Sequence, residues 1–242
     1  MSLTPNTLKR VKTTSKFATK PGDSYGINVH EMRYVHVPRG TLPTHPAFMA
    51  TKLCVKGFCS RNPEENVKRE LAVQRIIAIV APDMAIPMVR NRGADGKGVP
   101  EVVMRWGRGL PECSKRVQRT EKQEFEYGAM VLLDILSGMA DRHSGNWVIG
   151  PVHLYPIDHE SCRFSTMKSV EQYDYRVRNL SNTAKTGALW MAERIGENAR
   201  PVARWMTVAM RSDKLRVGEY TEKQVRVWAE AACKSLSAYM RP

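Results

Sequence analysis

Two oxygen-bearing side chains in residues 139–164 could together bind a metal ion. The short apolar runs 147–149 and 152–157 are separated by a Gly-Pro pair, which predicts a β-hairpin. Asn146 directly precedes the first run and Asp158 directly follows the second, so the hairpin should bring them close together. A carboxylate and an amide oxygen held side by side are suitable ligands for a hard cation such as Mg²⁺. The sequence therefore predicts a Mg²⁺ site at Asn146 and Asp158.

Asp141 and His143 lie on the loop that enters this hairpin, in the tripeptide D-R-H. Asp141 is five residues before Asn146, and from there its carboxylate could contact a substrate hydroxyl. We expect His143 to orient the loop by hydrogen bonding, because its spacing to His153 and His159 matches no common zinc-binding pattern. A solvated charged loop followed by a turn asparagine is the structural alternative.

The order Asp-x-x-x-x-Asn, followed about a dozen residues later by a strand-borne Asp, resembles the phosphoryl-transfer constellation of kinases. The D-R-H order, in place of H-R-D, and the I-D-H step at residues 157–159 resemble the phosphatidylinositol 3- and 4-kinase-like branch of the protein kinase-like superfamily. They also resemble the HipA-like and Fam20-like atypical kinases. The joint match is more specific than Asp-x-x-x-x-Asn alone. It covers roughly residues 48–164, and its specific part runs from Asp141 to Asp158.

This resemblance implies a protein that binds ATP and Mg²⁺ and moves the γ-phosphoryl group to a hydroxyl acceptor. Asp141 would orient and deprotonate the hydroxyl, while Asn146 and Asp158 would hold the metal. We expect a protein acceptor rather than a phosphoinositide, because the segment after Phe164 is too short for a full lipid-kinase lobe. Glu160 stands where the family usually has glycine, which leaves a catalytically inactive protein as an alternative.

A strand with a central lysine is expected over residues 48–55, where alternate positions would face opposite sides of a sheet. Lys52 follows Ala50 by two positions. This A-x-K resembles the third strand of kinases and implies that Lys52 reaches the ATP phosphates. Lys56 lies on the same face and is the alternative, although we expect it at the frayed end of the strand. A lysine that protects an edge strand against aggregation is the structural alternative.

A helix is predicted from Pro63 to just before Pro82, since Asn62 can cap it and Pro82 ends it. Glu70 lies at the margin of its apolar face. The resemblance implies an ion pair between Glu70 and Lys52 that aims the lysine at the nucleotide. A solvated helix charge is the alternative for Glu70.

Two further strands, at residues 86–89 and 102–106, flank the turn-rich sequence G-A-D-G-K-G and predict a hairpin. The resemblance implies that backbone groups near Met104 and Trp106 meet the adenine edge, and that the glycine-rich connector after them is a hinge. A strand-turn-strand with Gly40 at its tip could cover the phosphates with backbone N–H groups, although no G-x-G-x-x-G is present there. An ordinary hairpin is the structural alternative.

Helices dominate the rest of the chain. Thr120 and Gln123 form a capping-box signature at the start of an apolar helix that should lead into the D-R-H loop, and three more helical segments follow. We therefore expect an α+β, two-lobed protein kinase-like fold, with a small N-terminal antiparallel sheet plus one helix and a mainly helical C-terminal lobe. The expected domains are a flexible basic arm at residues 1–22, an N-lobe at 23–107 and a C-lobe at 108–242.

The formal net charge of +14 favours an anionic partner, such as a nucleotide, nucleic acid or an acidic protein surface. A non-catalytic kinase-like protein that binds nucleic acid or a larger assembly is therefore the main alternative to a kinase. Nucleotidyl transfer, with ATP inverted in the same fold, is the second. Five scattered cysteines without a CxxC pair favour a reducing compartment, and no apolar run approaches the length of a bilayer span. We therefore expect a cytoplasmic protein.

Overall fold

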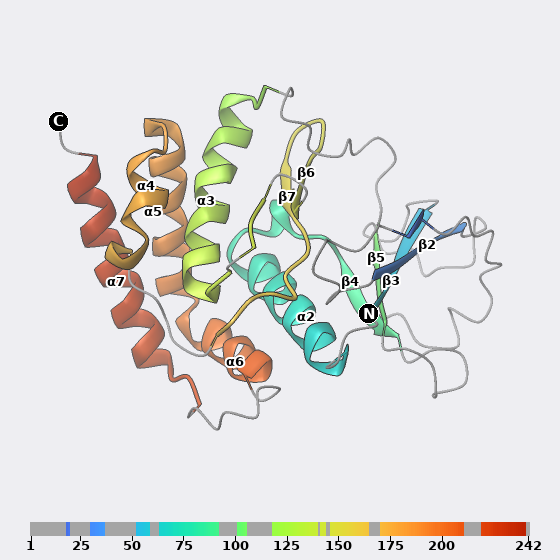
Figure 1. Ribbon diagram of the computed structural model, residues 1–242. Helices are drawn as coiled ribbons and strands as arrows, with labels where there is room; N and C mark the ends of the chain where they lie inside the picture. The colour runs from blue at the N-terminus through green and yellow to red at the C-terminus, as the bar shows by residue number, and fades with distance from the viewer. Residues whose placement is uncertain are drawn as a thin grey trace. The chain divides into compact units, whose positions relative to one another are not determined.

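The computed structural model (Figure 1) is an α+β structure in which strands β1 to β5 precede most of the helices. It describes residues 18–19, 30–36, 52–58, 63–91, 101–105, 118–139, 141–143, 146–164, 170–210 and 219–240. The chain divides into two units: the first comprises residues 1–71 and 86–110, and the second residues 72–85 and 111–242. Residues 72–85, which we expected in the first unit, group with the second because their apolar side chains belong to its core.

In the first unit, five antiparallel strands form one sheet in the order β1-β2-β3-β5-β4. They are β1 (Ala18–Thr19), β2 (His30–His36), β3 (Lys52–Phe58), β4 (Met88–Asn91) and β5 (Glu101–Arg105). The predicted hairpin of β4 and β5 is confirmed, with Met88 opposite Met104. Because β1 pairs with β2, the basic arm expected at residues 1–22 includes a short strand. Most of the segment expected to cover the phosphates lies outside the described residues.

The strand β3 begins and ends later than the sequence predicts. We expected a strand at residues 48–55 with Lys52 in its middle, but Lys52 is the first residue of β3 and Lys56 lies in its interior. Gly57 disfavours a strand on propensity alone, yet it pairs with residues of both β2 and β5. Pairing on two sides therefore extends β3, and Lys56 rather than Lys52 occupies a central position in it.

Helix α2 (Pro63–Val80) confirms the helix predicted after Asn62, and the 3₁₀ helix η2 (Pro82–Met84) follows it. Its first turn carries Glu64 and Glu65, which is favourable at the positive end of a helix dipole. Arg90 of β4 donates to both carboxylate oxygens of Glu64, at 2.6 and 2.5 Å. This ion pair ties the start of α2 to the sheet of the first unit.

The second unit is mainly helical. Its elements are α3 (Glu121–Ser137), β6 (Trp147–Ile149), β7 (Leu154–Pro156), η4 (Glu171–Tyr173), α4 (Asp174–Arg178), α5 (Asn182–Glu197), α6 (Ala199–Met210) and α7 (Glu222–Tyr239). Helix α5 packs between α3 and α7 (Figure 1). A Cβ on Gly128 would lie 1.7 Å from the main-chain oxygen of Ala184, and one on Gly187 would lie 1.8 Å from that of Phe125. Helices α3 and α5 therefore meet backbone to backbone.

Helix α3 leads into the D-R-H loop, as predicted. Its first turn has the complete capping box between Thr120 and Gln123. Gly138 ends the helix in the left-handed conformation, with φ of 63°, and a Cβ there would lie 2.5 Å from the main-chain oxygen of Arg163. Glycine at this position thus allows both the turn and the close approach of the segment that follows Asp158.

Cys162 is buried and Cys233 is half-buried, and both are free thiols. Burial, and after it the charge of Glu193, raises the pKa of the Cys233 thiol, which lowers its reactivity. Among the helices that the structure describes, none combines the length and the apolar character that crossing a membrane requires.

Candidate functional site

The predicted hairpin is confirmed and holds the two metal-ligand candidates at its base. Strands β6 and β7 pair antiparallel, and Trp147 lies opposite Pro156. Beyond this pair, the main-chain N–H of Ile157 donates to the main-chain oxygen of Asn146 at 3.0 Å. The backbones of Asn146 and of the residue that precedes Asp158 are therefore in direct contact.

Asn146 is buried and has a free acceptor. Its Nδ2 donates to the main-chain oxygen of Asp141 at 2.5 Å, which fixes the orientation of the amide, because only the nitrogen can face a carbonyl. Its Oδ1 is buried and has no hydrogen-bond partner among the residues that the structure describes. A buried polar atom without a partner costs about 1–3 kcal/mol, so such an atom calls for a ligand or a functional explanation.

Asp158 has an unusual backbone conformation. Its φ of 62° lies in the left-handed region, which aspartate and asparagine tolerate better than most residues with a side chain. Conformations of this kind cluster at functional sites, where the surrounding structure holds them in place. The side chain is half-buried at the end of the hairpin.

The loop before the hairpin holds Asp141 in an accessible position. The Asp141 side chain is 60% exposed, and Nε2 of His143 lies 4.0 Å from its Oδ1. The main-chain oxygen of His143 accepts a hydrogen bond from the N–H of Asn146 at 2.9 Å. On the other side, Nη1 of Arg176, on α4, donates to the main-chain oxygen of Met139 at 3.2 Å. The loop is thus fixed through its backbone while the Asp141 carboxylate faces solvent.

Arg142, between the two predicted catalytic residues, is a site residue that the sequence reasoning missed. It is almost fully buried, and its Nε and Nη2 each lie 2.9 Å from a carboxylate oxygen of Asp134 on α3. Its Nη1 donates to the main-chain oxygens of Ile157, at 2.7 Å, and of Asn146. The only sequence signal for this pair is an acid, Asp134, within the apolar C-terminal half of α3, and that signal does not name its partner.

The electrostatics of the Asp134–Arg142 pair reflect its burial. Burial raises the pKa of the Asp134 carboxyl above its ordinary value, and the nearby guanidinium of Arg142 opposes that rise. Asp134, which we expected to be structural, is therefore the carboxylate that orients Arg142.

His159, of the I-D-H step, is fully buried beside the same arginine. Nη2 of Arg142 lies 3.2 Å from its Nδ1, and the side-chain amide nitrogen of Gln74 lies 3.0 Å from its Nε2. Nε2 lies 3.2 Å from the main-chain oxygen of Pro156, and that oxygen also accepts from Nε2 of Gln74 on α2 at 2.8 Å. His159 thus belongs to the buried support of the hairpin.

His153, the third histidine of residues 139–164, pairs with a glutamate of α3. Nδ1 of His153 lies 2.6 Å from Oε1 of the buried Glu126 on α3, whose Oε2 accepts the main-chain N–H of Leu154 at 2.7 Å. Among the described residues, no group of three or more His, Cys, Asp and Glu side chains is placed to hold a metal ion. Glu126 instead fixes the turn of the hairpin to α3.

The first unit carries the residues expected to bind the nucleotide. Lys52 is the first residue of β3, and Met104 lies on β5 opposite Cys54, while Trp106 is outside the described residues. Glu70 on α2 is 1% exposed, so the alternative of a solvated helix charge is wrong. A buried carboxylate requires compensation by other groups, and an ion pair between Glu70 and a β3 lysine stays a prediction.

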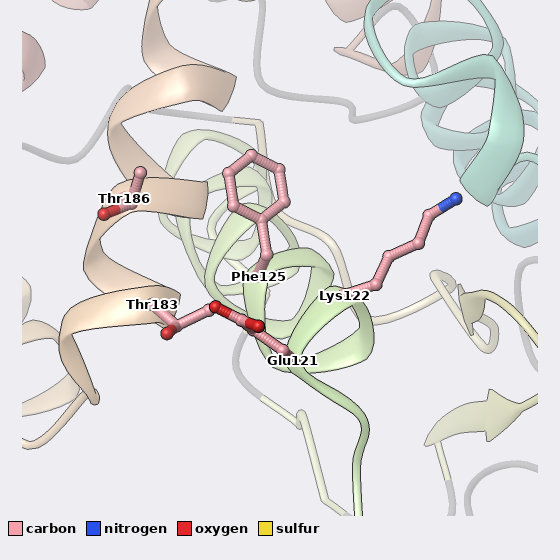
Figure 2. Close-up of a pocket in the computed structure, with 5 residues that line it drawn as sticks. All are labelled: Glu121, Lys122, Phe125, Thr183 and Thr186. Carbon is pink, nitrogen blue, oxygen red and sulfur yellow. The ribbon is translucent and has the colours of Figure 1, made fainter.

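A separate, open pocket lies where the first turns of α3 and α5 meet (Figure 2). It has a volume of about 430 Å³ and is lined by Glu121, Lys122, Phe125, Thr183 and Thr186. One acidic and one basic side chain give this lining no net charge that would select an anion. The lining contains none of the predicted site residues.

No protein-family model matches the chain, and no curated protein matches it either. The hairpin, the D-R-H loop and the buried groups that support them are therefore the features from which we infer the function.

Proposed function

We propose that the protein is a kinase-like phosphotransferase that uses ATP and Mg²⁺ to phosphorylate a hydroxyl group, with a protein as the acceptor. The observation that carries the proposal is the buried Oδ1 of Asn146, which has no hydrogen-bond partner in the described part of the chain. It lies at the base of the hairpin that ends in Asp158. A hard cation is the ligand that suits an amide oxygen together with a carboxylate.

The metal ion, when bound with ATP, would neutralise negative charge on the phosphate oxygens. The task of this chain is to present its oxygen ligands in a fixed arrangement. Asn146 is suited to that task because its amide is held by the main chain of Asp141 and its backbone by Ile157. Asp158 supplies the negative charge that an amide lacks.

Asp141 is the proposed catalytic base. Its carboxylate is exposed, so an acceptor hydroxyl can reach it, and its main-chain oxygen is fixed by Asn146. In this role it accepts the proton of the hydroxyl as the new oxygen–phosphorus bond forms, while the bond from the γ-phosphorus to the β–γ bridging oxygen breaks and ADP leaves. His143, next to this carboxylate, would orient it.

A lysine of β3 would neutralise phosphate charge in the proposed enzyme. The resemblance favours Lys52, whereas the interior position of Lys56 favours that residue. Glu70 is proposed as the partner of the lysine, and Met104 and Trp106 as the residues at the adenine edge. ATP affinities of Lys52→Met and Lys56→Met would identify the lysine, because only the one that binds phosphate should weaken the affinity.

Two alternatives use other features of the chain. The net charge of +14 favours a non-catalytic protein that binds nucleic acid, and the buried Glu160, in place of the usual glycine, is compatible with lost activity. Nucleotidyl transfer would use the same ligands with ATP inverted. Both alternatives predict a different fate for the γ-phosphate.

Incubation with ATP labelled at the α- or the γ-phosphate distinguishes these functions. The proposal predicts Mg²⁺-dependent transfer of the γ-label to protein acceptors. Transfer should be lost in Asp158→Asn and should be unchanged in the control Asp83→Asn, which alters an exposed aspartate of η2. Transfer of the α-label would show nucleotidyl transfer. Binding of ATP without transfer of either label would favour the inactive protein, and no binding of ATP with Mg²⁺ would contradict the site itself.

A further inference from the structure

The second unit buries the charge pair Asp134–Arg142 next to the candidate metal site. We propose that Arg142 is a positioning residue: held by Asp134, it sets the relative placement of Asn146 and Asp158 and thereby the affinity of their site for the metal ion. This inference rests on the proposed function, because it concerns how the same site is assembled.

Arg142 links the two ends of the hairpin through the main chain. Its Nη1 donates to the main-chain oxygen of Ile157 at 2.7 Å and to that of Asn146. One acceptor thus belongs to a proposed ligand, and the other belongs to the residue directly before Asp158. Since the N–H of Ile157 already donates to the oxygen of Asn146, the guanidinium adds a second link between the same two positions.

The rest of the guanidinium is fixed by side chains. Nε and Nη2 donate to the carboxylate of Asp134 on the rigid helix α3, and Nη2 also lies 3.2 Å from Nδ1 of the fully buried His159. The ring of His159 is in turn held at the main-chain oxygen of Pro156. Arg142 therefore cannot turn without giving up hydrogen bonds to both ends of the hairpin.

This role requires an arginine and not merely a positive charge. A guanidinium carries five N–H donors in a rigid plane, whereas a lysine carries three donors on one nitrogen. A lysine at position 142 could keep the charge beside Asp134 but could not reach the carboxylate and both main-chain oxygens at once. Arg142→Lys therefore separates the geometric role from the electrostatic one.

Stability alone is a weak reason to bury this pair, because the desolvation of two charges offsets much of their attraction. The contacts of Arg142 with groups other than Asp134 give a reason for burying the pair. Groups that hold metal ligands in place from behind typically change metal affinity by about 10–100-fold when they are lost. The main-chain contacts of Arg142 at Asn146 and Ile157 give it this position behind the ligand pair.

The test compares Arg142→Lys with a matched control, Arg119→Lys. Like Arg142, Arg119 binds an acid of α3: its Nε donates to Oε2 of Glu124 at 2.6 Å. Its guanidinium lies 3.9 Å from the ring centre of Tyr127, which is also on α3. The first readout is amide hydrogen exchange of the free protein in peptides that span residues 146–158. The second is the ratio of ATP affinities with Mg²⁺ and with EDTA, which isolates the contribution of the metal ion.

We expect Arg142→Lys to accelerate exchange in the hairpin by at least about tenfold, with exchange in α5 and α7 unchanged. The affinity ratio should fall by about 10–100-fold, while Arg119→Lys changes neither readout. If Arg142→Lys does not fold, Asp134→Asn serves as the second variant, because it keeps an acceptor oxygen and removes the charge that holds Arg142. It should move both readouts in the same direction.

Unchanged exchange in the hairpin would overturn the inference, and so would faster exchange with an unchanged affinity ratio. Both results leave the proposed function standing if the wild-type protein binds ATP in a Mg²⁺-dependent manner. A wild-type protein whose ATP affinity is the same with Mg²⁺ and with EDTA would overturn the proposed function and this inference together.

Discussion

The middle and the C-terminal part of α3 make two different kinds of buried contact. In the middle, Gly128 brings the backbone of α3 against that of α5, and the contact has no room for a methyl group. Nearer the C-terminus, Asp134 buries a charge and directs Arg142 toward main-chain oxygens of the hairpin. The first contact depends on shape, whereas the second depends on the direction of hydrogen bonds.

This difference indicates how the second unit divides its tasks. Close packing stabilises the fold and tolerates little added volume. The hydrogen bonds of Arg142, in contrast, fix the two ends of the β6–β7 hairpin, where Asn146 and Asp158 lie. Substitutions at the helix crossing should therefore act mainly on stability, and substitutions around the hairpin mainly on ligand binding and catalysis.

Gly128→Ala should have the largest effect on the free energy of unfolding. The added Cβ would lie 1.7 Å from the main-chain oxygen of Ala184, and a helix backbone cannot move aside as a flexible side chain can. We expect a loss of about 3 kcal/mol or more, measured by chemical denaturation followed by circular dichroism.

Gly196→Ala is the matched control, in α5 itself. Its added Cβ would lie 3.3 Å from the Cβ of Ala229, and alanine favours a helix over glycine by about 1 kcal/mol. The net change should stay within about 1 kcal/mol. Similar losses in Gly128→Ala and Gly196→Ala would contradict the view that α3 and α5 meet more tightly at Gly128 than α5 and α7 do at Gly196.

Asp158→Asn should affect stability only when nucleotide is present. Asparagine tolerates the left-handed backbone as aspartate does, so the free protein should unfold with nearly the wild-type free energy. Mg²⁺ with ATP at 100 times its dissociation constant should stabilise the wild type by about 2.7 kcal/mol. The variant should lose most of this gain, which thermal denaturation with and without EDTA measures. A full gain in the variant would exclude Asp158 as a metal ligand.

The pH dependence of stability should report on Asp134. Burial raises the pKa of its carboxyl above the ordinary value of 3.8, so the folded protein binds this proton more tightly than the unfolded chain does. Its contribution to stability is therefore complete below 3.8 and is lost as the pH rises through the folded-state pKa. Asp134→Asn should remove this slope, which amounts to at most about 1.4 kcal/mol per pH unit. Parallel profiles of the unfolding free energy in the two proteins would show that Asp134 does not titrate in this way.

The elements with local signals could be predicted from the sequence. The capping box at Thr120 defines the start of α3, two prolines bracket α2, and a Gly-Pro pair turns the β6–β7 hairpin. Each of these signals lies within a few residues of the structure that it specifies. The contact between the backbones of Asn146 and Ile157 followed from the hairpin alone.

The features set by distant parts of the chain could not be predicted. The bounds of β3 depend on its pairing with β2 and β5, which overrides the weak strand propensity of Gly57. The role of Arg142 depends on the packing of α3 against the loop that follows it, and no periodicity reports that contact. A charged residue in a D-R-H loop is ordinarily solvated, so only the structure reveals that this one is buried.

Asp141→Asn should have the smallest effect on stability and a large effect on transfer. The side chain is exposed, so the free energy of unfolding should change by less than about 0.5 kcal/mol. Loss of a general base typically slows a reaction by about 10²–10⁴-fold. ATP affinity should be unchanged, because the metal ligands and the phosphate-binding lysine remain. Single-turnover transfer of γ-labelled phosphate measures the rate, with Asp83→Asn as an exposed control. An unchanged rate in Asp141→Asn would show that another residue is the base. A loss of stability would show that Asp141 has a structural role, like the residues that pack on α3, and does not serve only the chemistry of the exposed loop.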